Sequence, residues 1–80
     1  MTLYESKKGQ SYELTRLFVQ ESITRRLQAL GLNEGTRLAV INRKKRGAII
    51  IRVRGTRLAL GKEIAKGIEV KETKDDGKQD

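Results

Sequence analysis

The chain contains several short runs in which apolar and polar residues alternate. The clearest is AIIIRVR, residues 48–54, where Ile49, Ile51 and Val53 fall on the side opposite to Arg52 and Arg54. A period of two residues is typical of a half-buried β-strand. Further strands are predicted, with weaker patterns, at residues 12–17, 37–42, 57–60 and 68–70.

One segment follows a helical period instead. In SITRRLQALGL, residues 22–32, three apolar residues stand at i, i+4 and i+7, namely Ile23, Leu27 and Leu30. This spacing predicts one apolar stripe of a short amphipathic helix, with Ser22 as its N-cap. Gly31 suits the left-handed residue after the helix, and Leu32 is then placed to contact Leu27.

The predicted elements are too short for a flat sheet and follow one another through short glycine turns. Such strands are expected to curl into a small barrel, because a flat sheet of this size would leave long edges open. GKEIAKG, residues 61–67, adds about one helical turn before the last strand. With 80 residues the chain makes a single domain, predicted at 1–72, and the aperiodic end at 73–80 is expected to be a disordered tail.

The composition excludes several kinds of chemistry. The chain has no His and no Cys, so histidine bases, cysteine nucleophiles and the softer metal ligands are absent, and its glutamates are scattered. We therefore expect no enzymatic activity, no metal site and no cofactor. No apolar run approaches the length of a membrane span, and MTLYESKKGQ lacks the apolar core of a secretory signal, so the cytoplasm is the expected location.

The positive charge is concentrated in one part of the chain. The formal net charge is +8, and residues 36–61 contain no Asp or Glu. The seven cations of NRKKRGAIIIRVRGTR, residues 42–57, are Arg43, Lys44, Lys45, Arg46, Arg52, Arg54 and Arg57. They could contact nucleic-acid phosphates, an acidic protein or anionic lipid, or they could form only a solvated turn and the outer face of a strand. Because Tyr12 and Phe18 are expected in the core, no aromatic platform for base stacking is predicted.

The order of these segments resembles the FeoA family, the small cytosolic component of bacterial ferrous iron uptake. The resemblance covers about residues 2–70 and is carried by TLYESKKGQSYEL, RRLQALGLNEGTRLAV, IIIRVRG and LALGKEIAKGIEV. It implies an SH3-like barrel of about five strands with one inserted short α-helix. It also implies a non-enzymatic accessory protein that docks on FeoB, a membrane transporter with a cytosolic GTPase domain.

The resemblance also suggests where a partner binds. The family's helix and neighbouring loops imply contacts at Arg25, Arg26, Leu32, Asn33 and Glu34, although these residues equally fit a solvated helix face and a helix stop. The basic hairpin loop departs from the family, since KKRG stands where family members commonly have a loop such as LGDP. We expect a FeoB-type partner, with weak anionic lipid contact and with phosphate-mediated nucleic-acid binding as the alternative. The oligomeric state is not defined by the sequence.

Overall fold

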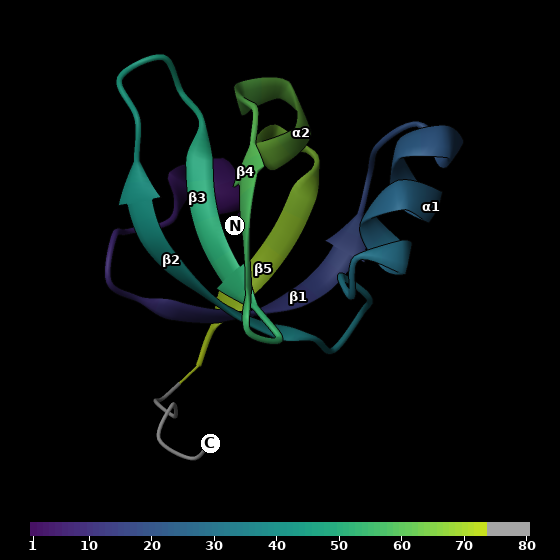
Figure 1. Cartoon of the computed structure of the whole chain (residues 1–80), viewed down its shortest axis with the longest axis horizontal. Coiled ribbons are helices and arrows are strands. Elements are labelled where there is room, and N and C mark those ends of the chain that lie inside the picture. The colour runs from purple at the N-terminus through teal and green to yellow at the C-terminus, as the bar shows by residue number, and fades with distance from the viewer. Residues whose placement is uncertain (74–80) are drawn as a thin grey trace.

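The computed structural model describes residues 1–73 as five antiparallel strands and three short helices around one core (Figure 1). The sheet order is β4-β3-β2-β1-β5. In chain order the elements are η1 (Leu3–Glu5), β1 (Ser11–Leu17), α1 (Glu21–Ala29), β2 (Arg37–Arg43), β3 (Ile49–Val53), β4 (Thr56–Leu60), α2 (Lys62–Lys66) and β5 (Ile68–Glu72).

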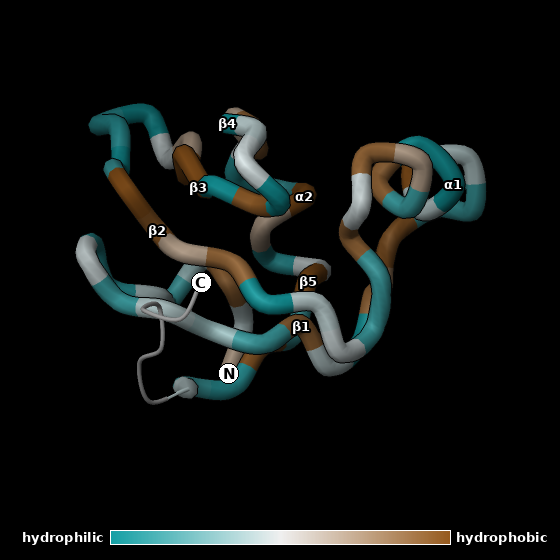
Figure 2. The backbone as a smooth tube through the Cα atoms, turned by 60° about the horizontal axis from the view of Figure 1, so that its bottom comes forward, coloured by the Kyte–Doolittle hydropathy of each residue, from teal (hydrophilic) through white to brown (hydrophobic). Residues whose placement is uncertain are grey.

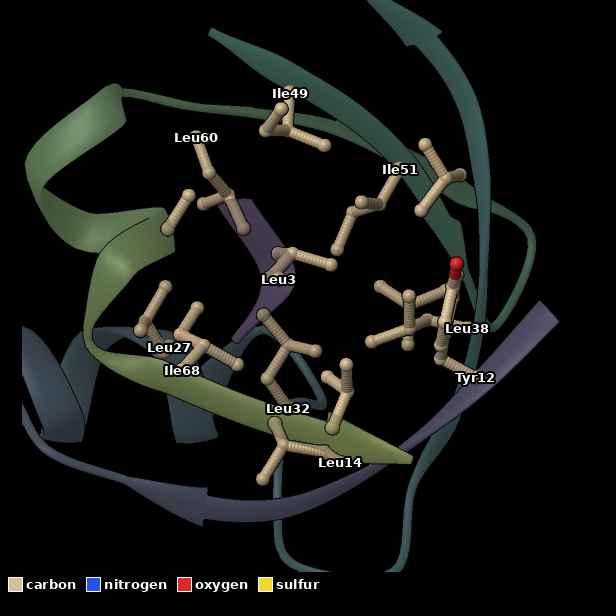
Figure 3. Packing of buried hydrophobic residues seen from close by; sticks show 14 residues of the cluster. Leu3, Tyr12, Leu14, Leu27, Leu32, Leu38, Ile49, Ile51, Leu60 and Ile68 are labelled. Carbon is tan, nitrogen blue, oxygen red and sulfur yellow. The ribbon is translucent and has the colours of Figure 1, made fainter. Parts of the chain in front are cut away.

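The predicted mainly β fold of about five strands is confirmed, and α1 is inserted between β1 and β2 as expected. The helical turn expected after β4 forms the five-residue α2. The 3₁₀ turn η1 was not predicted, although its Leu3 is fully buried and lies in the middle of the core in Figure 3. A 3₁₀ helix of only three residues is too short to show a helical period in the sequence.

The alternation in β3 sets the inner row of the barrel. Ile49, Ile51 and Val53 are fully or almost fully buried, while Arg52 is exposed. Because Val40 of β2 pairs with Ile51, the two strands present their apolar sides to the same core. Figure 3 shows Ile49 and Ile51 converging with Leu14, Leu32, Leu38, Leu60 and Ile68.

Helix α1 ends as the sequence predicts. Gly31 has a φ of +102°, its N–H donates to the Gln28 carbonyl, and the N–H of Leu32 donates to the Leu27 carbonyl at 2.9 Å. These two bonds form a Schellman ending, which satisfies carbonyls that the helix leaves free. Leu27 and Leu32 are both buried, so this ending also anchors α1 to the barrel.

The predicted start and stripe of α1 need correction. Gln20, and not Ser22, is the N-cap, because the N–H of Thr24 already donates to the Gln20 carbonyl at 2.8 Å. Leu30 was expected in the apolar stripe but is 44% exposed, since it is the C-cap where the chain leaves the helix. Of the three residues predicted for the stripe, Leu27 is buried in the core and Ile23 is half-buried.

The two expected core aromatics behave differently. Tyr12 is fully buried, and its hydroxyl accepts a hydrogen bond from the N–H of Lys7 at 2.8 Å. Phe18 is 58% exposed, so its predicted core position is wrong. The reason is that the register of β1 shifts between Leu14 and Arg16, so the alternation that buries Tyr12 and Leu14 leaves Arg16 exposed and does not turn Phe18 inward.

The chain end was predicted to be structureless from residue 73. Strand β5 extends to Glu72, which pairs with Tyr12, and the N–H of Thr73 donates to the Ser11 carbonyl at 3.2 Å. The remainder of the predicted tail, residues 74–80, lies outside the described residues. None of the described helices has the length and apolar character needed to cross a membrane.

Gly67, which follows α2, provides a test of the packing. An added Cβ there would lie 2.6 Å from the Phe18 carbonyl oxygen and 2.6 Å from a Val19 methyl, whereas one at Gly61 would meet nothing within 4 Å. We expect Gly67→Ala to lower the free energy of unfolding by about 2 kcal/mol. The control Gly61→Ala should change it by less than about 1 kcal/mol. Urea unfolding measures both, and equal losses would contradict the close contact.

Candidate partner-binding surface

The predicted site residues fall into groups on different parts of the surface, with one exception. Leu32 is fully buried, so its side chain belongs to the core and offers nothing to a partner. Its backbone N–H donates to the Leu27 carbonyl and so closes the end of α1. The other residues lie at the end of α1, on the β2–β3 loop and on the β3–β4 hairpin.

The α1 group is open to solvent. Arg25 pairs with Glu21 at 2.9 Å, but the two side chains are 75% and 80% exposed, so the pair contributes little to stability. Arg26 lies in the last turn, where a cation is favourable beside the free carbonyls. Asn33 and Glu34 are exposed in the following turn, where the N–H of Asn33 donates to the Thr36 hydroxyl at 3.1 Å.

The side chain of Arg54 extends from the β3–β4 hairpin to the end of α1, near the α1 group. The sequence placed Arg54 on the outer face of β3, but that strand ends at Val53, and both Arg54 and Gly55 have positive φ, 53° and 79°. They form a two-residue hairpin turn, for which two positive φ values are the usual requirement. A Cβ added to Gly31 would lie 2.8 Å from Cδ of Arg54, so this side chain reaches over the end of α1. Arg26 and Arg54 are thereby brought to the same helix terminus.

Arg52 and Arg57 stand directly opposite each other on β3 and β4. Both are exposed, and like charges at such a position are unfavourable. Neither makes a salt bridge within residues 1–73, where Arg25 with Glu21 is the pair observed. Strands β2, β3 and β4 supply no carboxylate to compensate them. This arrangement suits an external anion better than it suits the isolated fold.

The cations at the end of β2 and in the β2–β3 loop have different roles. Arg43 is held in place, because its guanidinium donates to the Ser6 carbonyl at 2.6 Å and to the Tyr4 carbonyl at 3.0 Å. Lys44, Lys45 and Arg46 are exposed in the turn that follows. Figure 2 shows this loop as a hydrophilic segment projecting from one end of the barrel.

Sequence reasoning missed an apolar groove between the start of α1 and α2. It has a volume of about 320 Å³ and is lined by Phe18, Val19, Gln20, Ile23, Glu63 and Ile64. The N–H of Phe18 donates to the Gly67 carbonyl at 2.6 Å, which fixes the backbone beside the groove. The guanidinium of Arg16 lies 5.7 Å from the Phe18 ring centre, a cation–π distance. The signal that could have found the groove is FV at residues 18–19, two apolar residues in succession after a strand whose alternation has ended.

Sequence reasoning also missed a group at the Tyr4 ring, where Arg43 is joined by Lys62 and Lys66. Tyr4, Lys62 and Lys66 come from η1 and α2, far from the basic loop in the sequence. No group of three His, Cys, Asp or Glu side chains suited to hold a metal ion occurs among residues 1–73. The candidate site in residues 1–73 thus combines exposed cations with an apolar groove.

A curled five-stranded antiparallel sheet with a helix inserted after its first strand places the chain among small SH3-like barrel domains. The family model described as the FeoA domain matches residues 1–72. The chain therefore belongs to the FeoA family and is a small protein related to ferrous iron transport. This family consists of accessory-type domains and is not a known enzyme family.

Solved structures agree with this assignment and confirm the expected SH3-like barrel. The solution structure of the FeoA protein from Chlorobium tepidum is 33% identical, with a TM-score of 0.86, and the match covers 96% of this chain and 75% of that one. An iron uptake regulatory protein (FeoA) is 27% identical, with a TM-score of 0.82 and coverages of 91% and 97%. A manganese-dependent transcriptional repressor, 21% identical with a TM-score of 0.83, shares the fold over 91% of this chain and 41% of its own. No curated protein sequence matches significantly.

The bonds of Arg43 predict a structural role for this cation. Arg43→Met keeps the aliphatic stem but removes two hydrogen bonds to carbonyl oxygens, and we expect the free energy of unfolding to fall by about 1–2 kcal/mol. Lys45→Met in the same loop should leave it within about 0.5 kcal/mol of the wild type. Urea unfolding of the two variants checks this, and equal effects would mean that Arg43 is only another solvated cation.

Replacing one of the facing arginines, Arg52 and Arg57, should raise the free energy of unfolding, whereas replacing Arg43 should lower it. Arg57→Glu places a carboxylate against Arg52, and we expect it to raise the free energy of unfolding by about 0.5 kcal/mol. Arg57→Ala removes only the repulsion, so its free energy of unfolding should lie between those of the wild type and Arg57→Glu. Thermal unfolding at low salt measures the order, and a wild type more stable than both variants would refute the repulsion.

Proposed function

We propose that this protein is a non-enzymatic accessory subunit of ferrous iron uptake that docks on the cytosolic side of a FeoB-type membrane GTPase transporter and modulates its activity. Its place would be the cytoplasm, at the inner face of the membrane. Family membership over residues 1–72 supports the connection with ferrous iron transport. The resemblance noted in the sequence supplies the transporter as the partner.

The observation that carries this proposal is the exposed Phe18 in the groove. Phe18 is 58% exposed beside Val19, Ile23 and Ile64 and so leaves apolar surface in water that a partner side chain could cover. Aromatic anchors at the centre of a small contact dominate many interfaces. The close contact of Gly67 with Phe18 and Val19 holds this part of the chain in place, so little ordering is required upon binding.

The cations supply a second component, orientation. Arg25 and Arg26 lie on α1, and Arg54 reaches the end of the same helix from the hairpin turn. Arg26 and Arg54 lie at the opposite end of α1 from the groove, and positive charges on this side of the barrel accelerate encounters with an acidic domain and set its orientation. Association with the transporter's cytosolic domain should therefore slow as salt is raised, while the apolar contact persists.

The alternative function is a nucleic-acid-binding barrel that uses phosphate contacts. It draws on the same cations, but it requires stacking rings only if single strands are bound. Tyr12 is unavailable for stacking because it is buried. The alternative predicts nucleic-acid binding that weakens steeply with salt and a shallower slope once Lys44, Lys45 and Arg46 are neutralised.

The docking proposal is tested with the purified full chain and the cytosolic domain of its own host's transporter. Phe18→Ser should weaken binding roughly tenfold to a hundredfold in calorimetry, since it removes an aromatic anchor. Leu30→Ser is the matched control, because this exposed leucine lies at the far end of α1 from the groove and should bind as the wild type does. Absence of binding by the wild type, with ferrous iron uptake unchanged by deletion of the chain, would refute docking. A stronger loss in Leu30→Ser would place the contact at the other end of α1.

A further inference from the structure

Three cations surround one tyrosine ring at an end of the barrel. Cζ of Arg43 lies 5.7 Å from the ring centre of Tyr4, Nζ of Lys62 lies 5.8 Å from it, and Nζ of Lys66 lies 5.4 Å from it. We call these four residues the Tyr4 cluster. Because all three charges are within 6 Å of one point, no two of them are more than about 12 Å apart.

The fold brings the cluster together from three separate segments. Arg43 is fixed by its two hydrogen bonds to carbonyl oxygens of Tyr4 and Ser6. Lys62 and Lys66 are four residues apart on α2, so they share one face of this helix, which packs against η1. The cluster is therefore a consequence of tertiary structure and is as ordered as the helix and strand that carry it.

The β2–β3 loop extends the same surface. A Cβ added to Gly47 would lie 3.0 Å from Cβ of Lys62, so the loop and α2 are in contact. Figure 1 shows the loop and α2 at the same end of the barrel. Lys44, Lys45 and Arg46 precede Gly47 and are exposed, so six cations gather at this end.

The nearby carboxylates do not neutralise these cations. Glu63 lines the groove with Phe18 and Ile64, which is a different side of α2 from the one near Tyr4. The carboxylate of Glu5 accepts a hydrogen bond from the N–H of Thr2 at 2.7 Å and is occupied by the start of η1. None of the six cations makes a salt bridge with a carboxylate of residues 1–73. A concentration of like charge without internal compensation is costly unless an outside anion shares it.

We propose that the Tyr4 cluster, with Lys44, Lys45 and Arg46, binds the phosphate headgroups of anionic lipids at the membrane surface. The source of the phosphate rests on the proposed function, which places the chain beside a membrane transporter. A projecting end with several long cationic side chains suits a planar anionic surface. The Tyr4 ring is half-buried and already faced by three cations, so it is poorly placed to stack on a base.

The test uses the full chain and sedimentation with vesicles of phosphatidylcholine, with or without phosphatidylglycerol. Wild type should bind only the vesicles with phosphatidylglycerol, and less at higher salt. The double variant Lys62→Gln and Lys66→Gln should lower the partition coefficient roughly thirtyfold, the effect expected for two cations near an anionic surface. The control double variant Arg37→Gln and Lys71→Gln removes two charges beside Glu13 and should reduce it much less.

Other outcomes overturn the inference. No binding to vesicles with phosphatidylglycerol, or equal losses in the two double variants, would refute a lipid site at the Tyr4 cluster. Displacement by millimolar inorganic phosphate would assign the cluster to a small phosphate ligand. Tighter binding to an oligonucleotide, lost in the Lys62 and Lys66 variant, would assign it to nucleic acid. Thermal unfolding verifies that both variants fold. Binding of the transporter's cytosolic domain without lipid is measured separately with Phe18→Ser, so the lipid site and the docking proposal fail independently.

Discussion

The structure depends on the contact between the inner sides of β2 and β3. Val40 pairs with Ile51, and the apolar row of β3 covers the centre of the core around Leu3. The buried cluster includes one aromatic residue, Tyr12, so aliphatic side chains fill nearly all of the interior. Since strand neighbours alternate between faces, placing the isoleucines of β3 inward fixes Arg52 outward. The requirements of the core therefore decide where the charges can be.

That constraint explains why the surface is so unevenly charged. Strands β2 to β4 provide the core with apolar residues and the solvent with cations, and they contain no acid. The facing pair Arg52 and Arg57 gains nothing from this arrangement within the fold. Arg43, in contrast, contributes an internal contact, through its bonds to the Tyr4 and Ser6 carbonyls. Arg52 and Arg57 are held in place by the barrel without stabilising it, which is the pattern expected of a binding surface.

The sequence predicts the strands and the end of α1 because both depend on neighbours in the chain. Alternation placed Ile49, Ile51 and Val53 correctly, and Gly31 followed by Leu32 marked the Schellman ending. The misassignments occur where a local period stops. Phe18 follows the last residue of β1, and Arg54 belongs to a turn that the pattern of β3 does not reveal. Arg54 was assigned by continuing the pattern of β3 beyond its last residue, whereas Phe18 was expected in the core because it is aromatic.

The candidate site was harder to predict for a different reason. The basic loop is visible in the sequence, but Tyr4, Lys62 and Lys66 join Arg43 only because η1 and α2 pack together. Lys62 and Lys66 have a helical spacing of four residues, but nothing in the sequence relates that pair to Arg43 or to Tyr4. The same limit applies to the groove, whose lining comes from the end of β1, the start of α1 and α2.

Helix α2 links the two surfaces and determines how they relate. Glu63 and Ile64 line the groove, while Lys62 and Lys66 lie at the Tyr4 cluster, and the buried Ala65 fixes the helix on the barrel between them. Because Ala65 packs this five-residue helix against the core, a rotation of α2 would move the residues of the groove and those of the Tyr4 cluster together. A protein partner in the groove and an anionic surface at the cluster would thus contact opposite sides of one rigid element. The barrel could then hold both at once, with its orientation at the membrane fixed by α2.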